Sequence, residues 1–120
     1  MRYVADTHVL VWVTADAGDR SLGSDARRIW RRAERGLDEI SVSTVTLFEV
    51  LLLVERRRRG TPARFVEWKA GLDEVPWLRV EPLTDADVDA ARGLAAVPDP
   101  CDRLIAATAL RLGVPLLTAD

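Results

Sequence analysis

A chain of 120 residues is long enough for one globular domain and too short for two. Its net charge of -2 excludes a globally basic nucleic-acid-binding protein, so any contact with a polyanion must come from a local patch. The single cysteine excludes an internal disulfide and a multi-thiolate zinc site. Without a long apolar run or a basic-then-apolar leader, the chain is expected to be cytoplasmic and without a membrane span.

The hydrophobic pattern predicts strands and helices in alternation. A short apolar run without polar alternation, such as residues 116–118, is typical of a buried parallel strand. Apolar residues at helical spacing, such as Ile29, Trp30 and Ala33, predict an amphipathic helix whose arginines face solvent. The whole order predicts an α/β domain with a parallel sheet and right-handed crossovers. In chain order, strands are expected at residues 2–5, 39–42, 77–83 and 116–118, helices at residues 8–13, 25–36, 44–60, 63–75, 84–96 and 100–112, and a loop at residues 16–19.

Specific residues mark the expected helix ends. Pro100 suits the first position of the last helix, which makes Asp99 its N-cap. Gly113 is expected to end the same helix, and Gly36 an earlier one. Further helix starts are expected at Ser24, at Ser43, at Thr61 and at Thr84, where Asp87 would complete a capping box.

Glu49 is the most informative single residue. It is the only charged residue between Thr44 and Val54, in a helix apolar enough to be buried on most faces. An isolated buried carboxylate costs several kcal/mol or takes up a proton, so a positive group should meet it. Arg56 lies about two turns away along the helix and is a poor candidate. A core glutamate bonded to a backbone group is the simpler alternative.

Four carboxylates are expected to meet at the carboxyl edge of a parallel sheet. Asp6 follows the first strand, Asp120 follows the last, and Glu49 lies in the helix after the second. Asp102 lies in the first turn of the last helix, where helical spacing should lean it toward the sheet. Carboxylates with pKa values of about 4 would all be ionised and would repel each other without cations. Oxygen ligands without a thiolate favour Mg²⁺ or Mn²⁺, and such a site suits phosphodiester cleavage.

These residues resemble a known family. The segments DTHVLVW, STVTLFEV, DPCDRLIAATAL and LLTAD are similar in order and spacing to the PIN-domain ribonucleases, above all the VapC-type toxins of bacterial toxin–antitoxin pairs. The resemblance covers essentially the whole chain and implies a PIN-like three-layer α/β/α sandwich with a short, mainly parallel sheet of about four or five strands. It implies a Mg²⁺- or Mn²⁺-dependent endoribonuclease whose metal-binding and catalytic residues are Asp6, Glu49, Asp102 and Asp120. Thr7, Ser43 and Thr118 would orient these acids or a bound water.

The same resemblance implies partners, and the chain departs from the family pattern in two places. The expected partners are an RNA such as tRNA or rRNA, a small antitoxin and a second copy of the chain. Family members usually carry roughly a dozen residues after the T-A-D motif, so the single domain at residues 1–120 is expected to lack them. Cys101 stands where the family often has Phe, which should affect packing more than chemistry.

Simpler structural roles stay open for several of these residues. Asp99 is expected to be a plain cap, and Asp6 could likewise be a plain loop-capping acid. Asp102 could serve the helix dipole, and Asp120 could be an ordinary chain end. His8 could touch metal or substrate, although a lone histidine in a first turn is more often structural. The arginine-rich runs RRIWRRAER and ERRRR could track RNA or be ordinary solvated surface.

Two other kinds of protein with acidic residues at a sheet edge do not fit this sequence. A receiver domain needs a central aspartate after its third strand, where this chain has Glu81-Pro82-Leu83. A haloacid-dehalogenase phosphatase needs an aspartate where His8 stands. The remaining alternative is a non-catalytic PIN-like module that acts through protein contacts, which the loss of an acid would mark. None of the four acids is missing.

Overall fold

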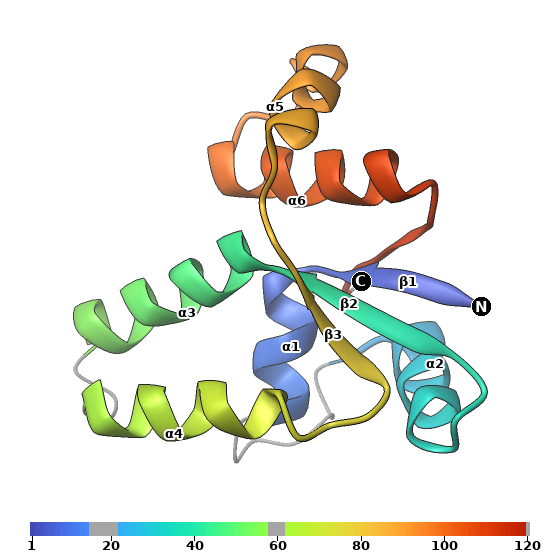
Figure 1. Cartoon of the computed structure of the whole chain (residues 1–120), viewed down its shortest axis with the longest axis vertical. Coiled ribbons are helices and arrows are strands. Elements are labelled where there is room, and N and C mark those ends of the chain that lie inside the picture. Colours follow the sequence, from blue (N-terminus) through green and yellow to red (C-terminus); the bar gives the residue numbers. More distant parts are fainter. Residues whose placement is uncertain (15–21, 58–61, 120) are drawn as a thin grey trace.

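The computed structural model describes residues 1–14, 22–57 and 62–119. Within these ranges, all strand pairs are parallel and form a four-stranded sheet in the order β3-β2-β1-β4. Helices cover both faces of this sheet, which confirms the predicted three-layer α/β/α architecture (Figure 1). None of the described helices is long and apolar enough to cross a membrane. The elements are β1 (Arg2–Ala5), α1 (Thr7–Thr14), α2 (Ser24–Glu34), β2 (Glu39–Ser43), α3 (Thr44–Arg57), α4 (Pro62–Leu72), β3 (Leu78–Glu81), α5 (Asp85–Ala91), the 3₁₀ turn η2 (Arg92–Leu94), α6 (Pro100–Leu112) and β4 (Leu116–Leu117).

The two faces of the sheet bury different sets of side chains. Along β1, Val4 points to the face covered by α6, where it packs with Ile105, and Ala5 points to the face covered by α1 and α2. The apolar stripe predicted for α2 is buried as expected, and the ring of Trp30 lies edge-on to Trp77 with centroids 5.0 Å apart. The amphipathic pattern therefore placed α2 correctly on the sheet.

Two neighbouring strands and the amino end of α2 meet at the carboxyl edge of the sheet. The N–H of Asp6, directly after β1, donates to the carbonyl of Leu117 in β4 over 3.0 Å. Two residues further on, the carbonyl of Ala119 accepts from the N–H of Gly23, also over 3.0 Å. The chain that leaves β4 is thus fixed between Asp6 and the start of α2.

The helix ends follow the predicted caps with one change. Asp99 caps α6 by accepting from the N–H of Asp102 over 2.9 Å, and Gly113 ends the helix with φ +67°. Helix α2 already includes Ser24, and the N-cap is Gly23 in an extended conformation, so the prediction that Ser24 caps this helix is wrong. The N–H of Gly23 is held by the carbonyl of Ala119, beyond β4, which fixes the chain outside the helix one residue earlier.

Several elements are shorter than predicted. Strand β3 ends at Glu81 because Pro82 has no N–H with which to continue the ladder. Helix α5 ends at Ala91 and passes into the 3₁₀ turn η2, which contains the poor helix former Gly93. Strand β4 has two residues. The loop expected at residues 16–19 and the helix start expected at Thr61 lie outside the described residues.

Helix α3 is less buried than its composition predicts. Phe48 is 54% exposed, and residues 50–54 are half-buried. Figure 1 shows α3 and α4 side by side, projecting beyond the sheet rather than lying along its face. An apolar surface of α3 is therefore left uncovered by the described part of the chain.

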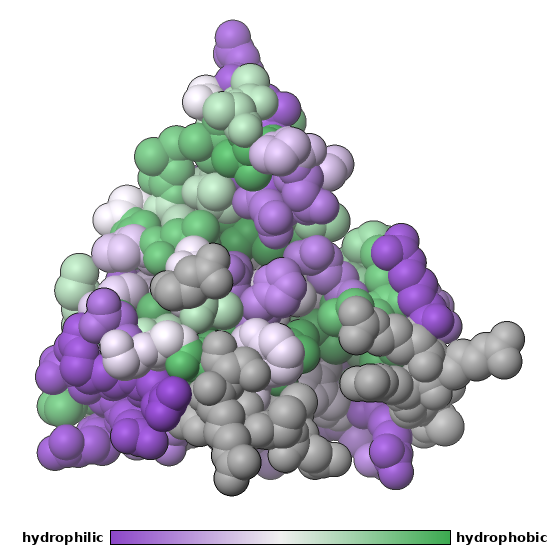
Figure 2. All heavy atoms as spheres, turned by 180° about the vertical axis from the view of Figure 1, so that it is seen from behind, coloured by the Kyte–Doolittle hydropathy of each residue, from purple (hydrophilic) through white to green (hydrophobic). Residues whose placement is uncertain are grey.

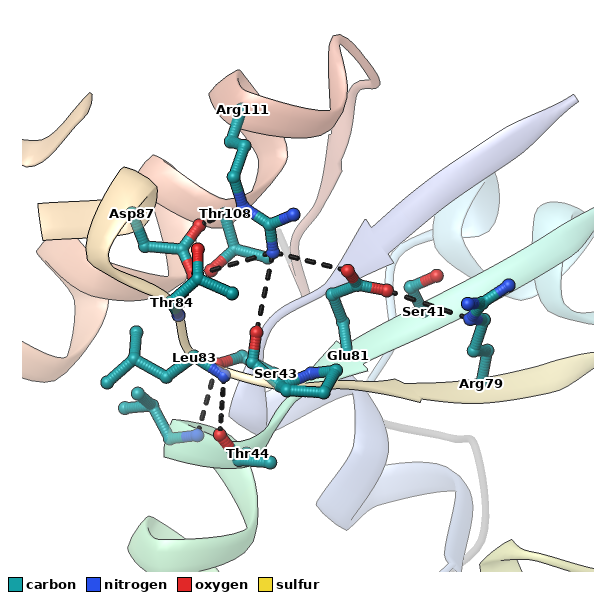
Figure 3. A network of polar contacts seen from close by, with 12 residues as sticks. Ser41, Ser43, Thr44, Arg79, Glu81, Leu83, Thr84, Asp87, Thr108 and Arg111 are labelled. Atoms are coloured by element: carbon teal, nitrogen blue, oxygen red, sulfur yellow. Dashed lines mark hydrogen bonds and ion pairs between the residues drawn. The ribbon is translucent and has the colours of Figure 1, made fainter. Parts of the chain in front are cut away.

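A buried ion cluster joins β3, α5 and α6 (Figure 3). The carboxylate of Asp87 is fully buried and pairs with the Nε of Arg111, whose Nη2 lies 3.2 Å from a carboxylate oxygen of Glu81. The other Asp87 oxygen accepts from the N–H of Thr84 over 2.7 Å, as the predicted capping box requires. The cap was predicted, but the link from Asp87 to the last helix was not.

Candidate metal centre

Asp6 is held rigidly where β1 turns into α1. Its carboxylate accepts from the N–H of Val9 over 3.0 Å, which makes it the cap of α1. Its own N–H is bound to β4, as described above. Burial raises the pKa of Asp6, the Val9 N–H and His8 oppose that rise, and the negative charge of Asp102 adds to it.

Glu49 meets the start of α1 from the first half of α3. The Thr7 hydroxyl donates to its Oε1 over 2.5 Å and also lies 3.3 Å from the Thr46 hydroxyl. Burial raises the pKa of Glu49, the Thr7 bond lowers it, and the charges of Asp102 and Asp99 raise it further. Among the described residues no arginine pairs with Glu49, and the basic group whose charge reaches it is His8.

The first turn of α6 brings Asp99 and Asp102 to the same place. Asp102 is exposed, so the prediction that it leans away from solvent is wrong: α6 begins to cover the sheet at Ile105, one turn later. Its charge nevertheless acts on both Asp6 and Glu49. The structure therefore brings together three of the four acids singled out in the sequence.

Asp99 is the residue that sequence reasoning missed. Oxygens of Glu49 and Asp99 and the sulfur of Cys101 lie within 4.8 Å of one another. The signal was present in the D-P-C-D spacing, because two acids three residues apart share one face of a first turn. The role of Asp99 as a helix cap accounts for an acid at this position, so the sequence gives no separate reason to expect Asp99 beside Glu49.

The donor set suits a hard divalent cation better than a soft one. Burial and the charges of Glu49, Asp99 and Asp102 raise the pKa of Cys101, which favours a neutral thiol that packs rather than binds metal. An octahedral Mg²⁺ with oxygens at about 2.1 Å separates its ligand atoms by about 3–4.2 Å, so a small adjustment would place the carboxylates of Glu49 and Asp99 on one ion. No lysine or arginine forms an ion pair with these acids within the described ranges, and burial, with a smaller effect from the charge of Asp102, raises the pKa values of Asp6 and Glu49. The residues present therefore fit Mg²⁺ or Mn²⁺.

The other predicted site residues lie in different surroundings. Ser43 is fully buried and accepts from the N–H of Val45, so it caps α3 as predicted. Thr118 is exposed just beyond β4. Neither hydroxyl bonds to a described acid. Asp120 lies outside the described residues, so its place among the acids stays a prediction.

Comparison with known proteins identifies the fold family. The family model described as PIN domain matches residues 3–120. This chain belongs to the PIN-domain family. This PIN domain is 31% identical over 117 residues to Ribonuclease VapC22 of Mycobacterium tuberculosis. The aligned region covers 96% of this chain and 84% of that relative, so this PIN domain is of the VapC type.

Two solved structures share the fold of this PIN domain. One is the crystal structure of VapBC2 from Rickettsia felis bound to a DNA fragment from their promoter, with a TM-score of 0.66, 18% identity and coverage of 97% of this chain and 86% of the other. The second is a toxin–antitoxin complex from Klebsiella pneumoniae, with a TM-score of 0.58, 15% identity and coverage of 95% and 82%. At these identities the likeness shows the fold alone.

Glu49→Gln is expected to stabilise this PIN domain slightly in metal-free buffer. The raised pKa means that the folded state holds the Glu49 proton more tightly than the unfolded state, so stability is lost as pH rises through the folded pKa. Glutamine keeps an oxygen for the Thr7 hydroxyl and removes the charge. We expect a gain of about 0.5 kcal/mol at pH 7, small because Glu49 is half-exposed, which vanishes near pH 4. Urea unfolding at both pH values measures it, and a loss of stability at pH 7 would show that Glu49 is a structural residue.

Proposed function

We propose that this PIN domain is the toxin of a toxin–antitoxin pair, an endoribonuclease that hydrolyses RNA phosphodiester bonds with Mg²⁺ or Mn²⁺. The observation that carries the proposal is that the negative charge of Asp102 acts on both Asp6 and Glu49, while no arginine or lysine of the described residues forms an ion pair with these acids. The relationship to Ribonuclease VapC22 supports the same activity. The toxin–antitoxin assemblies among proteins of the same fold support the same biological context.

The proposed metal ligands are Asp6, Glu49, Asp102 and Asp120, and we add Asp99 because its carboxylate lies beside that of Glu49. A bound Mg²⁺ or Mn²⁺ would supply Lewis-acid activation of water and charge stabilisation at the leaving oxygen. The chain itself contributes fixed geometry. The Val9 N–H holds Asp6, and the Thr7 hydroxyl orients Glu49, so neither carboxylate has to be ordered when an ion and a phosphate arrive.

The proposed partners are a small antitoxin and a second copy of this chain. The uncovered apolar side of α3, with Phe48 54% exposed, supports both because such surface is buried in protein interfaces. Size-exclusion chromatography and co-expression with the adjacent reading frame would examine each partner separately.

Removing divalent metal is the direct test of the proposed activity. Purified protein is expected to cleave structured RNA in Mg²⁺ or Mn²⁺ and to lose at least about 100-fold of its rate in EDTA. Adding back excess Mn²⁺ should restore the rate, and a thermal melt in EDTA should show that the domain stays folded. Undiminished cleavage in EDTA would overturn the proposal. Antitoxin binding without any cleavage would favour the non-catalytic binding module.

A further inference from the structure

One face of α2 carries a row of arginines. Arg28, Arg31 and Arg35 follow Ser24 at intervals of four, three and four residues, which aligns them along one side of the helix. Figure 2 shows the hydrophilic cluster over α2, at the lower left of the view from behind. A surface hollow of about 430 Å³ runs along it. The hollow is lined by Ser24, Arg27, Arg28, Arg31, Arg32 and Arg35.

Two arginines of the row, Arg28 and Arg35, keep their positive charge unpaired within the described residues. Arg32 pairs with the buried carboxylate of Asp38 over 2.9 Å, whereas Arg28 and Arg35 make no ion pair or side-chain hydrogen bond there. Arg27 donates from Nη2 to the Leu22 carbonyl, but its buried Nε has no acceptor. The exposed guanidinium groups of Arg28 and Arg35, by contrast, line the hollow, so an anionic oxygen there would gain charge-assisted hydrogen bonds.

The amino end of α2 is tied to the sheet edge where Asp6 lies, and the helix leads away from that edge. The N–H of Gly23 is bound to Ala119, at the sheet edge where Asp6 lies. The far end of the helix is near the opposite edge, since Asp38, the partner of Arg32, also accepts from the ammonium group of Met1. From Arg28 to Arg35 the helix rises about 10 Å, which matches about three phosphates of one duplex strand.

From these observations we propose that the arginine row of α2 binds the phosphates of the RNA strand that extends from the metal centre; this inference rests on the proposed ribonuclease function. A polymer with a charge at every unit matches a row of guanidinium groups that repeats once per helical turn. An acidic protein segment carries carboxylates only where its sequence places them, whereas a nucleic-acid strand carries a charge at every unit. The proposal accounts for an arginine-rich helix on a chain whose net charge is -2.

The test compares two charge-matched double variants. Arg28→Gln/Arg35→Gln removes two members of the row, and Lys69→Gln/Arg79→Gln removes two positive charges from α4 and β3. Both are made in an Asp6→Asn chain, so that RNA stays intact in Mg²⁺. Binding of a fluorescent single-stranded RNA of about 20 nucleotides and mixed sequence is followed by anisotropy between about 50 and 200 mM KCl.

Loss of the arginine pair is expected to weaken RNA binding about tenfold and to lower the slope of log K against log salt by about 1.4, since each single-strand phosphate contact contributes about 0.7. The RNA affinity of the Lys69/Arg79 control should stay within about twofold of that of the parent, because these two residues are not expected to contact phosphates. Equal losses in both pairs, an unchanged slope or absence of RNA binding by the parent would each overturn the proposal. So would retained RNA binding with loss of antitoxin binding, which would make this face a protein surface. Metal-dependent cleavage by the wild-type chain is measured separately, so its absence would count against the proposed function alone.

Discussion

Replacing Asp6 by asparagine is expected to lower RNA cleavage by at least about 100-fold in Mg²⁺. Asparagine keeps the shape of the side chain and an oxygen that can still accept from the Val9 N–H, so the turn from β1 into α1 should persist. What is lost is one negative charge of the acidic cluster, the one that lies directly after β1. Initial rates on a structured RNA measure the effect, and a thermal melt checks that the fold is retained.

A matched change outside the cluster gives the control. Asp73→Asn makes the same substitution at an exposed position just beyond α4 and should leave the rate within about twofold, as surface substitutions usually do. Asp102→Asn should behave like Asp6→Asn. Full activity in either cluster variant would remove the basis for assigning a metal site to this edge of the sheet.

Arg111→Met is expected to cause the largest loss of stability, about 3 kcal/mol. The substitution leaves Asp87 fully buried without its cation and also removes a contact to Glu81. Burial alone would raise the pKa of Asp87, but the bonds from Arg111 and Thr84 outweigh it and lower that pKa below its usual value. The wild-type cluster therefore stabilises the fold above the unfolded pKa of about 4, and its contribution is lost as pH falls below that value.

Urea unfolding of variants separates the ion pair from general effects of arginine removal. Arg92→Met, at an exposed position in η2, should change stability by less than about 0.5 kcal/mol. Asp87→Asn/Arg111→Met should recover part of the loss, since it removes the uncompensated charge. A stability near that of the wild type for Arg111→Met would mean that the cluster in Figure 3 contributes little.

Local patterns were sufficient to predict the architecture. Short apolar or alternating segments predicted the four parallel strands, and Asp99, Pro100 and Gly113 marked both ends of α6. The isolated charge of Glu49 predicted a positive partner, but no described arginine pairs with it; an approach to Asp102 was expected from the parallel sheet instead. The strand patterns and the helix-cap residues each lie within one segment, and the interactions behind them join residues a few positions apart.

What the sequence did not predict depends on pairs that are distant along the chain. Arg111 and Asp87 are separated by 24 residues, and either one alone looks like an ordinary surface charge. Asp99 has a sufficient local role as a cap, so its closeness to Glu49 becomes visible only once α6 is packed beside α3. The start of α2 was misplaced by one residue because a backbone bond from Gly23 to the distant Ala119 sets it. The end of β3 was misplaced although its cause, the missing N–H of Pro82, is visible in the sequence.

The two-residue strand β4 has a consequence for motion. Backbone bonds at Val4, Asp6 and Gly23 anchor this segment, one of them to α2 rather than to the sheet. Local opening of so short a ladder would break the backbone bonds at Asp6 and at Gly23 together. The amide hydrogen exchange rates of Gly23 and Asp6 should then fall by a similar factor when RNA is bound. Such a result would show that the two backbone bonds open together rather than independently.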